Sequence, residues 1–211
     1  YRLTTPTTVD TSLKGYWSFN GQDMLSSTTA ADRSGAGNNG TLTNGPTRTI
    51  GKIGQALSFD GSNDYVDAGD MLAMESQSAL TISAWINPAA LGNYDGIVSK
   101  YASLSSDTTL NLGGTGVGTT SSLVASIRNG SDTYGYTATG KIVTGVWTHC
   151  VMVFDGSQTG NDNRLKIYIN GANETLTFNG TIPSTTISNS QNLTIGRTGS
   201  ATDYFDGKID E

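Results

Sequence analysis

Carboxyl groups are the first side chains of this chain that raise the question of catalysis. Its 211 residues include only three glutamates, Glu75, Glu174 and Glu211. Retaining glycoside hydrolysis needs two carboxyl groups about 5 to 5.5 Å apart, and alternate positions of one β-strand supply that spacing. None of the three glutamates has an acidic residue at an alternate position of a predicted strand, and the aspartates of 60–70 cluster around a predicted turn. A glycosidase would therefore have to draw its two carboxylates from different strands.

The only histidine and the only cysteine are neighbours, His149 and Cys150, in the apolar segment 146–154. A single histidine excludes every mechanism that needs two. A nucleophilic triad would place His149 beside a serine or cysteine, but the Gly-x-Ser-x-Gly elbow is absent. We therefore predict that His149 is a partly buried, hydrogen-bonded structural residue and that Cys150 fills the core. One cysteine also excludes an intrachain disulfide.

Five tyrosines could form a surface that binds sugars. Ligand sites commonly combine aromatic rings with a few polar groups, and a sugar ring stacks on tyrosine while its hydroxyls form hydrogen bonds. Tyr134 and Tyr136 are two positions apart, so they share one face of a strand. Tyr94 and Tyr101 flank a predicted loop and strand, and Tyr204 lies in a predicted loop. The alternative for each is packing on the surface of a sheet.

The loops also offer the oxygen atoms that calcium prefers. Calcium takes about six to eight oxygen ligands from carboxylates, carbonyls, amide side chains and water. Such groups occur at Asn20, at Asp32, in the turn 60–64 and at Asp210. The same aspartates are also common turn residues whose carboxylates bind their own backbone. The spacing alone leaves both interpretations open.

The composition around these residues favours strands and turns. Threonine (31) and serine (23) make up 54 of the residues, and glycine adds 27. Threonine is enriched in strands, and glycine, serine and asparagine are enriched in turns. A net charge of −6 argues against a nucleic-acid partner, and no apolar run approaches the roughly 18 residues of a membrane span. We expect neither nucleic-acid binding nor membrane insertion, and the composition is typical of a bacterial extracellular domain.

Short predicted strands recur from residue 13 onward. Residues 13–19 are the first, residues 80–86 alternate between apolar and polar, and 147–154 is the most apolar run. Asn170-Gly171 predicts a hairpin turn before a strand at 175–178. No window has a helical period. About a dozen strands without a break predict one antiparallel sandwich or barrel over residues 13–211, preceded by a linker or N-terminal extension at residues 1–12.

Eight sequence blocks resemble a known family. They are GYWSFNG at 15–21, DRSGAGNNGTL at 32–42, GKIGQALSFDGSNDYVDAG at 51–69, LTISAWINP at 80–88, VWTHCVMVFDGS at 146–157, LKIYINGA at 165–172, NLTIGR at 192–197 and FDGKIDE at 205–211. In this order they resemble laminin G-like domains of the concanavalin A-like lectin/glucanase superfamily over residues 13–211. The resemblance implies a jelly-roll sandwich of two curved antiparallel sheets.

The resemblance also implies site residues. In that superfamily a calcium ion often joins an aspartate of the final strand to groups near the first strand and in a turn. Asp210 matches the aspartate, and Asn20 and Asp60-Gly61 match the other two positions. The retaining β-glucanases of the superfamily carry Glu-x-Asp-x-x-Glu on one strand, and this chain lacks that motif.

These observations predict a non-catalytic, calcium-stabilised binding module that acts outside the cell or on its surface. Its expected ligand is carbohydrate, such as a cell-surface glycan, and its expected contact residues are Tyr94, Tyr101, Tyr134, Tyr136 and Tyr204. Two alternatives stay open. One is a structural or adhesive subunit of a surface protein or appendage that contacts other protein subunits. The other is a glycosidase.

Overall fold

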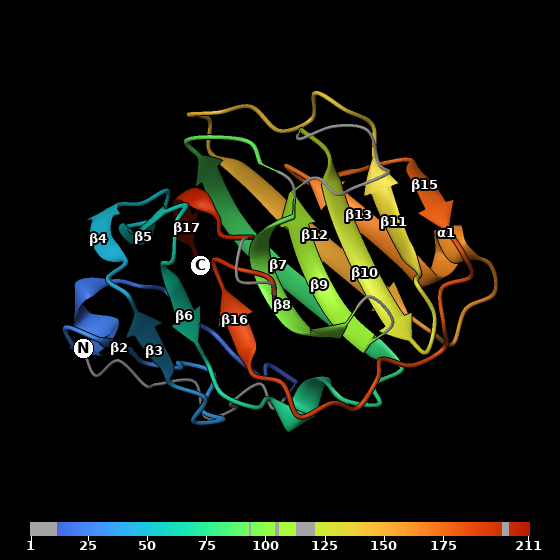
Figure 1. The fold of residues 1–211 in the computed structure, drawn as a ribbon, viewed down its shortest axis with the longest axis horizontal. Helices are drawn as coiled ribbons and strands as arrows, with labels where there is room; N and C mark the ends of the chain where they lie inside the picture. The colour runs from blue at the N-terminus through green and yellow to red at the C-terminus, as the bar shows by residue number, and fades with distance from the viewer. Residues whose placement is uncertain (1–11, 93, 104–105, 113–120, 200–202) are drawn as a thin grey trace, which may run out of the picture.

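The computed structural model describes residues 12–92, 94–103, 106–112, 121–199 and 203–211. Within these ranges, 17 β-strands form two antiparallel sheets (Figure 1). In the same ranges, helical structure is limited to the 3-10 turns η1 (Gly21–Asp23) and η2 (Leu72–Met74) and to α1 (Asn161–Arg164). No described helix is long and apolar enough to cross a membrane. The predicted all-β jelly-roll sandwich is confirmed, whereas the expected linker at 1–12 lies, except for Ser12, outside the described residues.

The larger sheet has ten strands and faces the viewer in Figure 1. Its order is β1 (Met24–Ser26), β2 (Thr29–Ala30), β3 (Gly40–Thr43), β6 (Tyr65–Asp67), β16 (Leu193–Ile195), β8 (Asp95–Ser103), β9 (Ser106–Leu112), β10 (Leu123–Asn129), β11 (Tyr134–Thr137) and β15 (Leu176–Asn179). Strands distant in the sequence are therefore neighbours, as in the contact of β16 with both β6 and β8.

The smaller sheet has seven strands and lies behind the first. Its order is β14 (Ala172–Asn173), β13 (Leu165–Ile169), β12 (Thr148–Asp155), β7 (Ala79–Pro88), β17 (Asp206–Asp210), β5 (Gln55–Asp60) and β4 (Thr47–Ile50). Strand β17 is an interior strand, because it pairs with β5 on one side and β7 on the other. Strand β4 is an edge strand and pairs with β5.

The core lies between the two sheets and follows the alternation of the strands. In β12 the side chains of Cys150, Met152 and Phe154 are buried, and the residues between them are half-buried. Burial raises the pKa of the Cys150 thiol to about 12, as suits a core residue. The prediction for Cys150 as a core residue is confirmed. His149 is half-buried, and its Nε2 lies 2.9 Å from Ser83 Oγ, so the predicted structural histidine is confirmed as well.

Two local predictions are wrong. Residues 13–19 form no strand, because the backbone there bonds to a loop: Tyr16 N–H donates to Asp32 Oδ1, and Arg33 N–H donates to the Tyr16 carbonyl. The turn at Asn170-Gly171 is present, with φ of 50° and 83°. It returns into the two-residue strand β14, however, whereas β15 crosses to the other sheet and pairs with β11.

Candidate functional site

One face of the ten-stranded sheet turns away from the seven-stranded sheet, and we call it the outer face. Strand β10 identifies it, because Leu123, Ala125 and Ile127 belong to the core. In a strand, successive side chains point to opposite faces. Ser126 and Arg128 therefore lie on the outer face, together with the residues that pair with them on neighbouring strands.

A row of polar residues crosses this face on all ten strands. From β1 to β15, the register pairs place in line Ser26, Thr29, Thr41, Asp67, Thr194, Ser99, Thr109, Ser126, Tyr134 and Asn179. The four central members are buried, with at most 4% of their surface exposed: Thr194, Ser99, Thr109 and Ser126. Each strand contributes one hydroxyl, carboxylate or amide group to the row, and no member of the row is an aliphatic residue.

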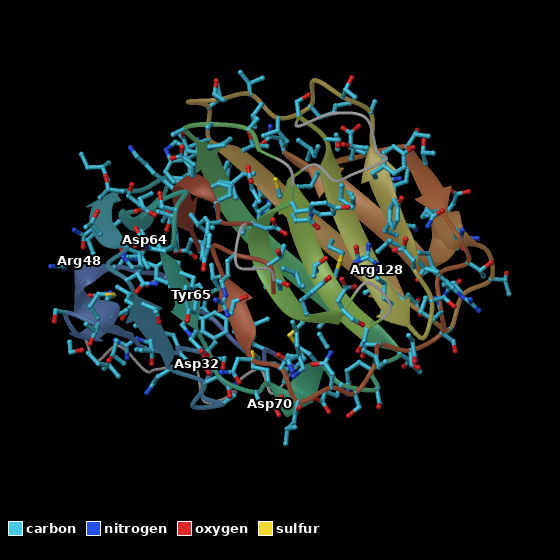
Figure 2. All side chains as sticks on the ribbon, viewed as in Figure 1. Asp32, Arg48, Asp64, Tyr65, Asp70 and Arg128 are labelled. Carbon is cyan, nitrogen blue, oxygen red and sulfur yellow. The ribbon has the colours of Figure 1, made fainter. Side chains whose placement is uncertain are left out.

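A hairpin covers part of the centre of the outer face. Arg197 and Tyr204 form an isolated antiparallel bridge, and residues 197–199 and 203–204 make the described parts of this covering hairpin. The Arg197 guanidinium lies 3.9 Å from the centre of the Tyr65 ring. Gly199 packs so closely against Tyr101 that an added Cβ would meet the ring. The hairpin separates two zones of the outer face. The first zone contains β3 and β6, and the second contains β10 and β11. Tyr65 on β6 and Arg128 on β10 are labelled in Figure 2, one in each zone.

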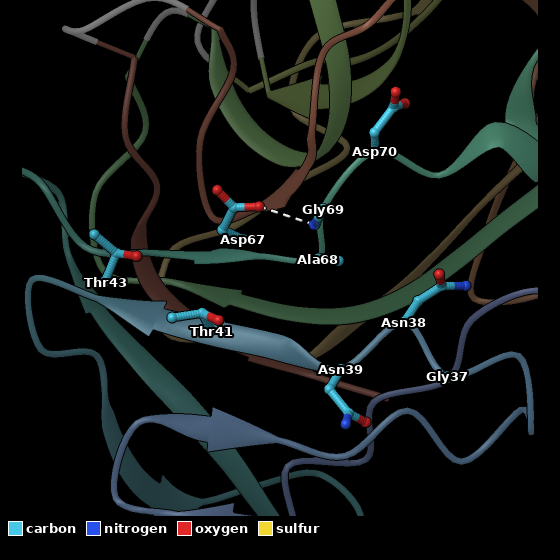
Figure 3. Close-up of a pocket in the computed structure, with 9 residues that line it drawn as sticks. All are labelled: Gly37, Asn38, Asn39, Thr41, Thr43, Asp67, Ala68, Gly69 and Asp70. Atoms are coloured by element: carbon cyan, nitrogen blue, oxygen red, sulfur yellow. Dashed lines mark hydrogen bonds between the residues drawn. The ribbon is translucent and has the colours of Figure 1, made fainter.

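A pocket opens in the first zone, at β3 and β6 (Figure 3). Its volume is about 510 Å³, and its lining consists of Gly37, Asn38, Asn39, Thr41, Thr43, Asp67, Ala68, Gly69 and Asp70. The Asp67 carboxylate is fixed, because Oδ1 accepts a hydrogen bond from Gly69 N–H at 2.9 Å and Oδ2 accepts one from Asn192 Nδ2 at 3.0 Å. The pocket is suited to hydrogen-bonding a ligand that carries hydroxyl groups.

A buried lysine holds the other pocket carboxylate. The Lys100 side chain is 2% exposed, and its Nζ donates to Asp70 Oδ1 at 2.5 Å and to the Gln191 carbonyl at 2.6 Å. It also lies 3.1 Å from Glu75 Oε1. The hydrogen bond from Ser188 and the Lys100 ammonium hold the pKa of Glu75 below its usual value, against the effect of burial. Lys100 thus ties the wall of the pocket to η2 and to the loop before β16.

The second zone contains four of the five predicted tyrosines. Tyr134 and Tyr136 lie side by side on β11 with ring centres 6.2 Å apart, and the Arg128 guanidinium is 5.5 Å from the Tyr134 ring. Burial raises the pKa of Tyr101 and of Tyr134, and Tyr94 contributes to both shifts because it is close to each. All four rings are half-buried.

The fifth tyrosine lies elsewhere. Tyr204 belongs to the covering hairpin, and its ring centre is 6.5 Å from that of Tyr65. It therefore belongs to the pocket side of the outer face and is separate from the other four. Sequence reasoning did not identify Tyr65 or Arg197, and it considered Asp67 and Asp70 only as carboxylates of a predicted turn, whereas Asp67 lies on β6. The alternation of Tyr65, Val66 and Asp67 was the available signal, because it places Tyr65 and Asp67 on one face.

A buried ion pair underlies the tyrosine zone. Arg128 NH1 donates to Asp107 Oδ2 at 2.5 Å, and Arg128 Nε lies 2.8 Å from Asp132 Oδ1. Asp107 is fully buried, and its Oδ1 has no hydrogen-bond partner among the described residues. Burial raises the pKa of Asp107, and the Arg128 guanidinium opposes that rise.

Asp95, at the start of β8, makes the stability of the fold depend on pH. Burial raises its pKa to about 6, the Gly92 N–H opposes this, and the carboxylates of Asp203 and Asp206 add to it. A carboxyl whose pKa is higher in the folded state stabilises the fold when protonated, and this contribution is lost as pH rises through about 6.

Between pH 8 and pH 5 the free energy of unfolding should rise by about 1 to 1.5 kcal/mol through Asp95. Chemical denaturation of Asp95→Asn should lack this increment, whereas Asp162→Asn on α1 should retain it; equal pH profiles for all three proteins would contradict the assignment.

The predicted calcium residues are only partly brought together. Asp210 Oδ2 accepts hydrogen bonds from Lys52 N–H at 2.8 Å and Ile53 N–H at 2.9 Å, and Asn20 Oδ1 accepts one from Gln55 N–H at 2.9 Å. Asn20 and Asp210 thus bind the two ends of one loop, 52–55. The turn at Asp60-Gly61 lies at the far end of β5, because Asp60 pairs with Asp206 and not with Asp210. The predicted grouping of Asp60 and Gly61 with Asp210 is therefore wrong.

The remaining predicted loop donors are engaged in turns. Asp60 Oδ1 accepts hydrogen bonds from the backbone of residues 62–64, and Asp32 accepts from Tyr16, Ser34 and Asn38. In the part of the chain that the structure describes, no three acidic, histidine or cysteine side chains converge on a metal position. Asp210 differs from these donors, because its Oδ1 is buried and has no hydrogen-bond partner within the described parts of the chain.

Comparisons with known proteins agree with this architecture. The family model described as concanavalin A-like lectin/glucanases superfamily matches residues 60–211. No curated protein sequence matches the chain. Among solved structures, the fold is similar to domain 4 of AbnA, a GH43 extracellular arabinanase from Geobacillus stearothermophilus, in complex with arabinotriose. That match has a TM-score of 0.65 and 22% identity, and it covers 94% of this chain and 89% of that one.

Two other similar structures are parts of larger chains. The binding domain of Paraclostridial Mosquitocidal Protein 1 matches with a TM-score of 0.63 and 16% identity, over 87% of this chain and 47% of that one. A Trypanosoma rangeli sialidase matches with a TM-score of 0.56 and 12% identity, over 89% of this chain but only 28% of the sialidase. At these identities the likeness concerns the fold.

Proposed function

This chain belongs to the concanavalin A-like lectin/glucanases superfamily, and from that membership we propose that it is a non-catalytic, extracellular or cell-surface module that binds carbohydrate. The observation that supports the proposal is the polar row of the outer face, which opens into a pocket of about 510 Å³. Hydroxyl, amide and carboxylate groups are the partners that sugar hydroxyls need. The similar domain of the arabinanase was solved with arabinotriose.

The two pocket carboxylates are both engaged by other groups of the protein. A glycosidase pairs one protonated carboxyl group with one ionised carboxylate. Both oxygens of Asp67 already accept hydrogen bonds, and Asp70 is bound to the Lys100 ammonium. Because both groups are already engaged by these partners, they do not form such a pair, and this supports a non-catalytic module.

Binding should depend on the exposed hydroxyl of Thr41, which lines the pocket. Thr41→Val removes that hydroxyl with little change in shape, and we expect it to weaken binding about 2- to 10-fold, as for one lost hydrogen bond. Titration calorimetry against neutral oligosaccharides, arabinotriose among them, measures the effect. Thr81→Val, on the exposed side of β7, is the matched control and should bind like the wild type. Failure of a broad glycan panel to bind, or release of reducing ends from it, would contradict the proposal.

We further propose that calcium stabilises the module at Asp210. The buried, unpartnered Oδ1 of Asp210 fits a cation, because a buried carboxylate oxygen without a partner is costly. Asp210 would be the carboxylate ligand, and Asn20 would contribute from the neighbouring end of the loop. Asp60 and Gly61 do not fit this group. A bound cation would hold β17 to the loop before β5.

Removing calcium should lower the melting temperature of the wild type. A ligand that binds only the folded state stabilises it by about 2.7 kcal/mol at a hundredfold excess over Kd, and each kcal/mol corresponds to roughly 2 to 4 °C for a chain of this size. Chelator should therefore shift melting by several degrees, and Asp210→Asn should abolish the response. Asp60→Asn is the matched control and should keep it. A wild-type melting curve that chelator leaves unchanged, in a protein shown to be metal-free by elemental analysis, would reject the calcium proposal.

A role in protein contacts is the second candidate, and the edge strand β4 favours it. Ile50 on β4 is 81% exposed, and nearby Ile53 is 54% exposed. Exposed apolar side chains beside an open strand edge are typical of a contact surface. If this surface is used, Ile50→Lys should abolish self-association or capture of a neighbouring subunit in sedimentation experiments, while sugar binding at the pocket is unchanged.

A further inference from the structure

We infer that the pocket of the outer face accepts uncharged or ammonium-bearing sugars and rejects sugars that carry a carboxylate. The inference rests on the proposed carbohydrate binding and names the ligand class. Its first support is the lining itself. Of the described residues that line the pocket, Asp67 and Asp70 are acidic, and none is lysine, arginine or histidine.

The second support is the charge behind the wall of the pocket. The Lys100 ammonium is buried, and it is already opposed by Asp70 and Glu75. Asp70 and Glu75 already outnumber this single ammonium, and Asp67 adds a carboxylate whose described partners are the uncharged Gly69 N–H and Asn192 amide, so the pocket carries an excess of negative charge. Arg197 lies on the Tyr65 ring and not among the lining residues.

The third support is hydrogen-bonding chemistry. The carboxylates of Asp67 and Asp70 are acceptors only, and they need donors from a ligand. Sugar hydroxyls and amino groups supply such donors. A ligand carboxylate supplies acceptors only, and it would also meet like charge at a partly desolvated site, where repulsion exceeds its value in water.

The test uses matched pairs of trisaccharides. Trigalacturonate differs from α-1,4-galactotriose by carboxylates, and the β-1,4-glucosamine trimer differs from cellotriose by ammonium groups. At low ionic strength we expect the carboxylates to weaken binding about tenfold, as for one like charge some 7 Å away at an intermediate dielectric constant, and the ammonium groups to preserve or strengthen it. About 1 M salt should narrow both differences, because the Debye length falls to about 3 Å.

Two variants assign the effect to the pocket. Asp67→Asn keeps an oxygen that can accept from Gly69 N–H but removes a charge. It should therefore reduce the gap in affinity between galactotriose and trigalacturonate. Asp162→Asn removes the same charge on the distant α1 and should leave the gap unchanged. If acidic sugars bind as well as or better than neutral ones, the inference is overturned and the proposed function stands. If a panel of neutral, amino and acidic glycans shows no binding at all, both are overturned.

Discussion

Replacing Lys100 with methionine should destabilise the protein by about 3 to 5 kcal/mol, the range for removing one partner of a buried ion pair. Methionine matches the length of the lysine stem, so the change isolates the loss of the ammonium. Lys100 is 2% exposed, and Glu75, whose side chain is 13% exposed, would be left without its cation. The Gln191 carbonyl would lose a donor as well. Urea denaturation monitored by tryptophan fluorescence measures the change.

The control for this experiment is Lys208→Met on β17. Lys208 is half-buried and has no described ion pair, so its replacement should change stability by about 0.5 kcal/mol or less. The stability of Lys100→Arg should lie between those of Lys100→Met and Lys208→Met, because arginine keeps the charge but lacks the compact ammonium group. Equal stability of Lys100→Met and wild type would show that the cluster contributes nothing to the fold.

The second large effect is expected at Arg128. Arg128→Met leaves the fully buried Asp107 without its guanidinium, which should again cost about 3 to 5 kcal/mol at pH 8. Because burial raises the pKa of Asp107, and the variant lacks the group that opposes this rise, the carboxyl should take up a proton as the pH falls. The variant should therefore regain stability between pH 8 and pH 5.

A double variant separates the ion pair from simple packing. Arg128→Met combined with Asp107→Leu removes both charges, and apolar replacement of a buried pair is often neutral or stabilising. The double variant should be more stable than Arg128→Met alone at pH 8. It should also lack the gain in stability that Arg128→Met shows between pH 8 and pH 5. If the two substitutions prove additive, the two residues are not coupled.

The alternation of apolar and polar residues predicted the strands and hence the fold class, but it could not predict which distant segments become neighbours. The alternation of Ile82, Ala84 and Ile86 in β7 is confirmed by their burial. The error at 13–19 has a specific cause: Tyr16 and Trp17 look like strand residues, but their partners are Asp32 and the Asn38 carbonyl, in a loop that periodicity does not describe.

The candidate site was harder to predict for the same reason. Thr41 and Asp67 are directly paired across β3 and β6, yet they are 26 positions apart in the sequence. Tyr134 and Tyr136 were predicted together because one strand carries both. Asp60 and Asp210 were grouped wrongly, since the antiparallel register that sets Asp60 against Asp206 moves Asp210 to the other end of the strand.

The interior position of β17 determines when the seven-stranded sheet can be completed during synthesis. Strands β5 and β7 do not pair with each other, and each waits for residues 206–210, more than a hundred residues after β7 ends. A nascent chain that has reached only β16 therefore holds two incomplete half-sheets, β4–β5 and β7–β12–β13–β14, each with an unpaired edge. Such edges readily pair with other chains, and pairings between distant segments form slowly. We therefore expect aggregation of the nascent chain to be most favoured in the interval between translation of β7 and of β17.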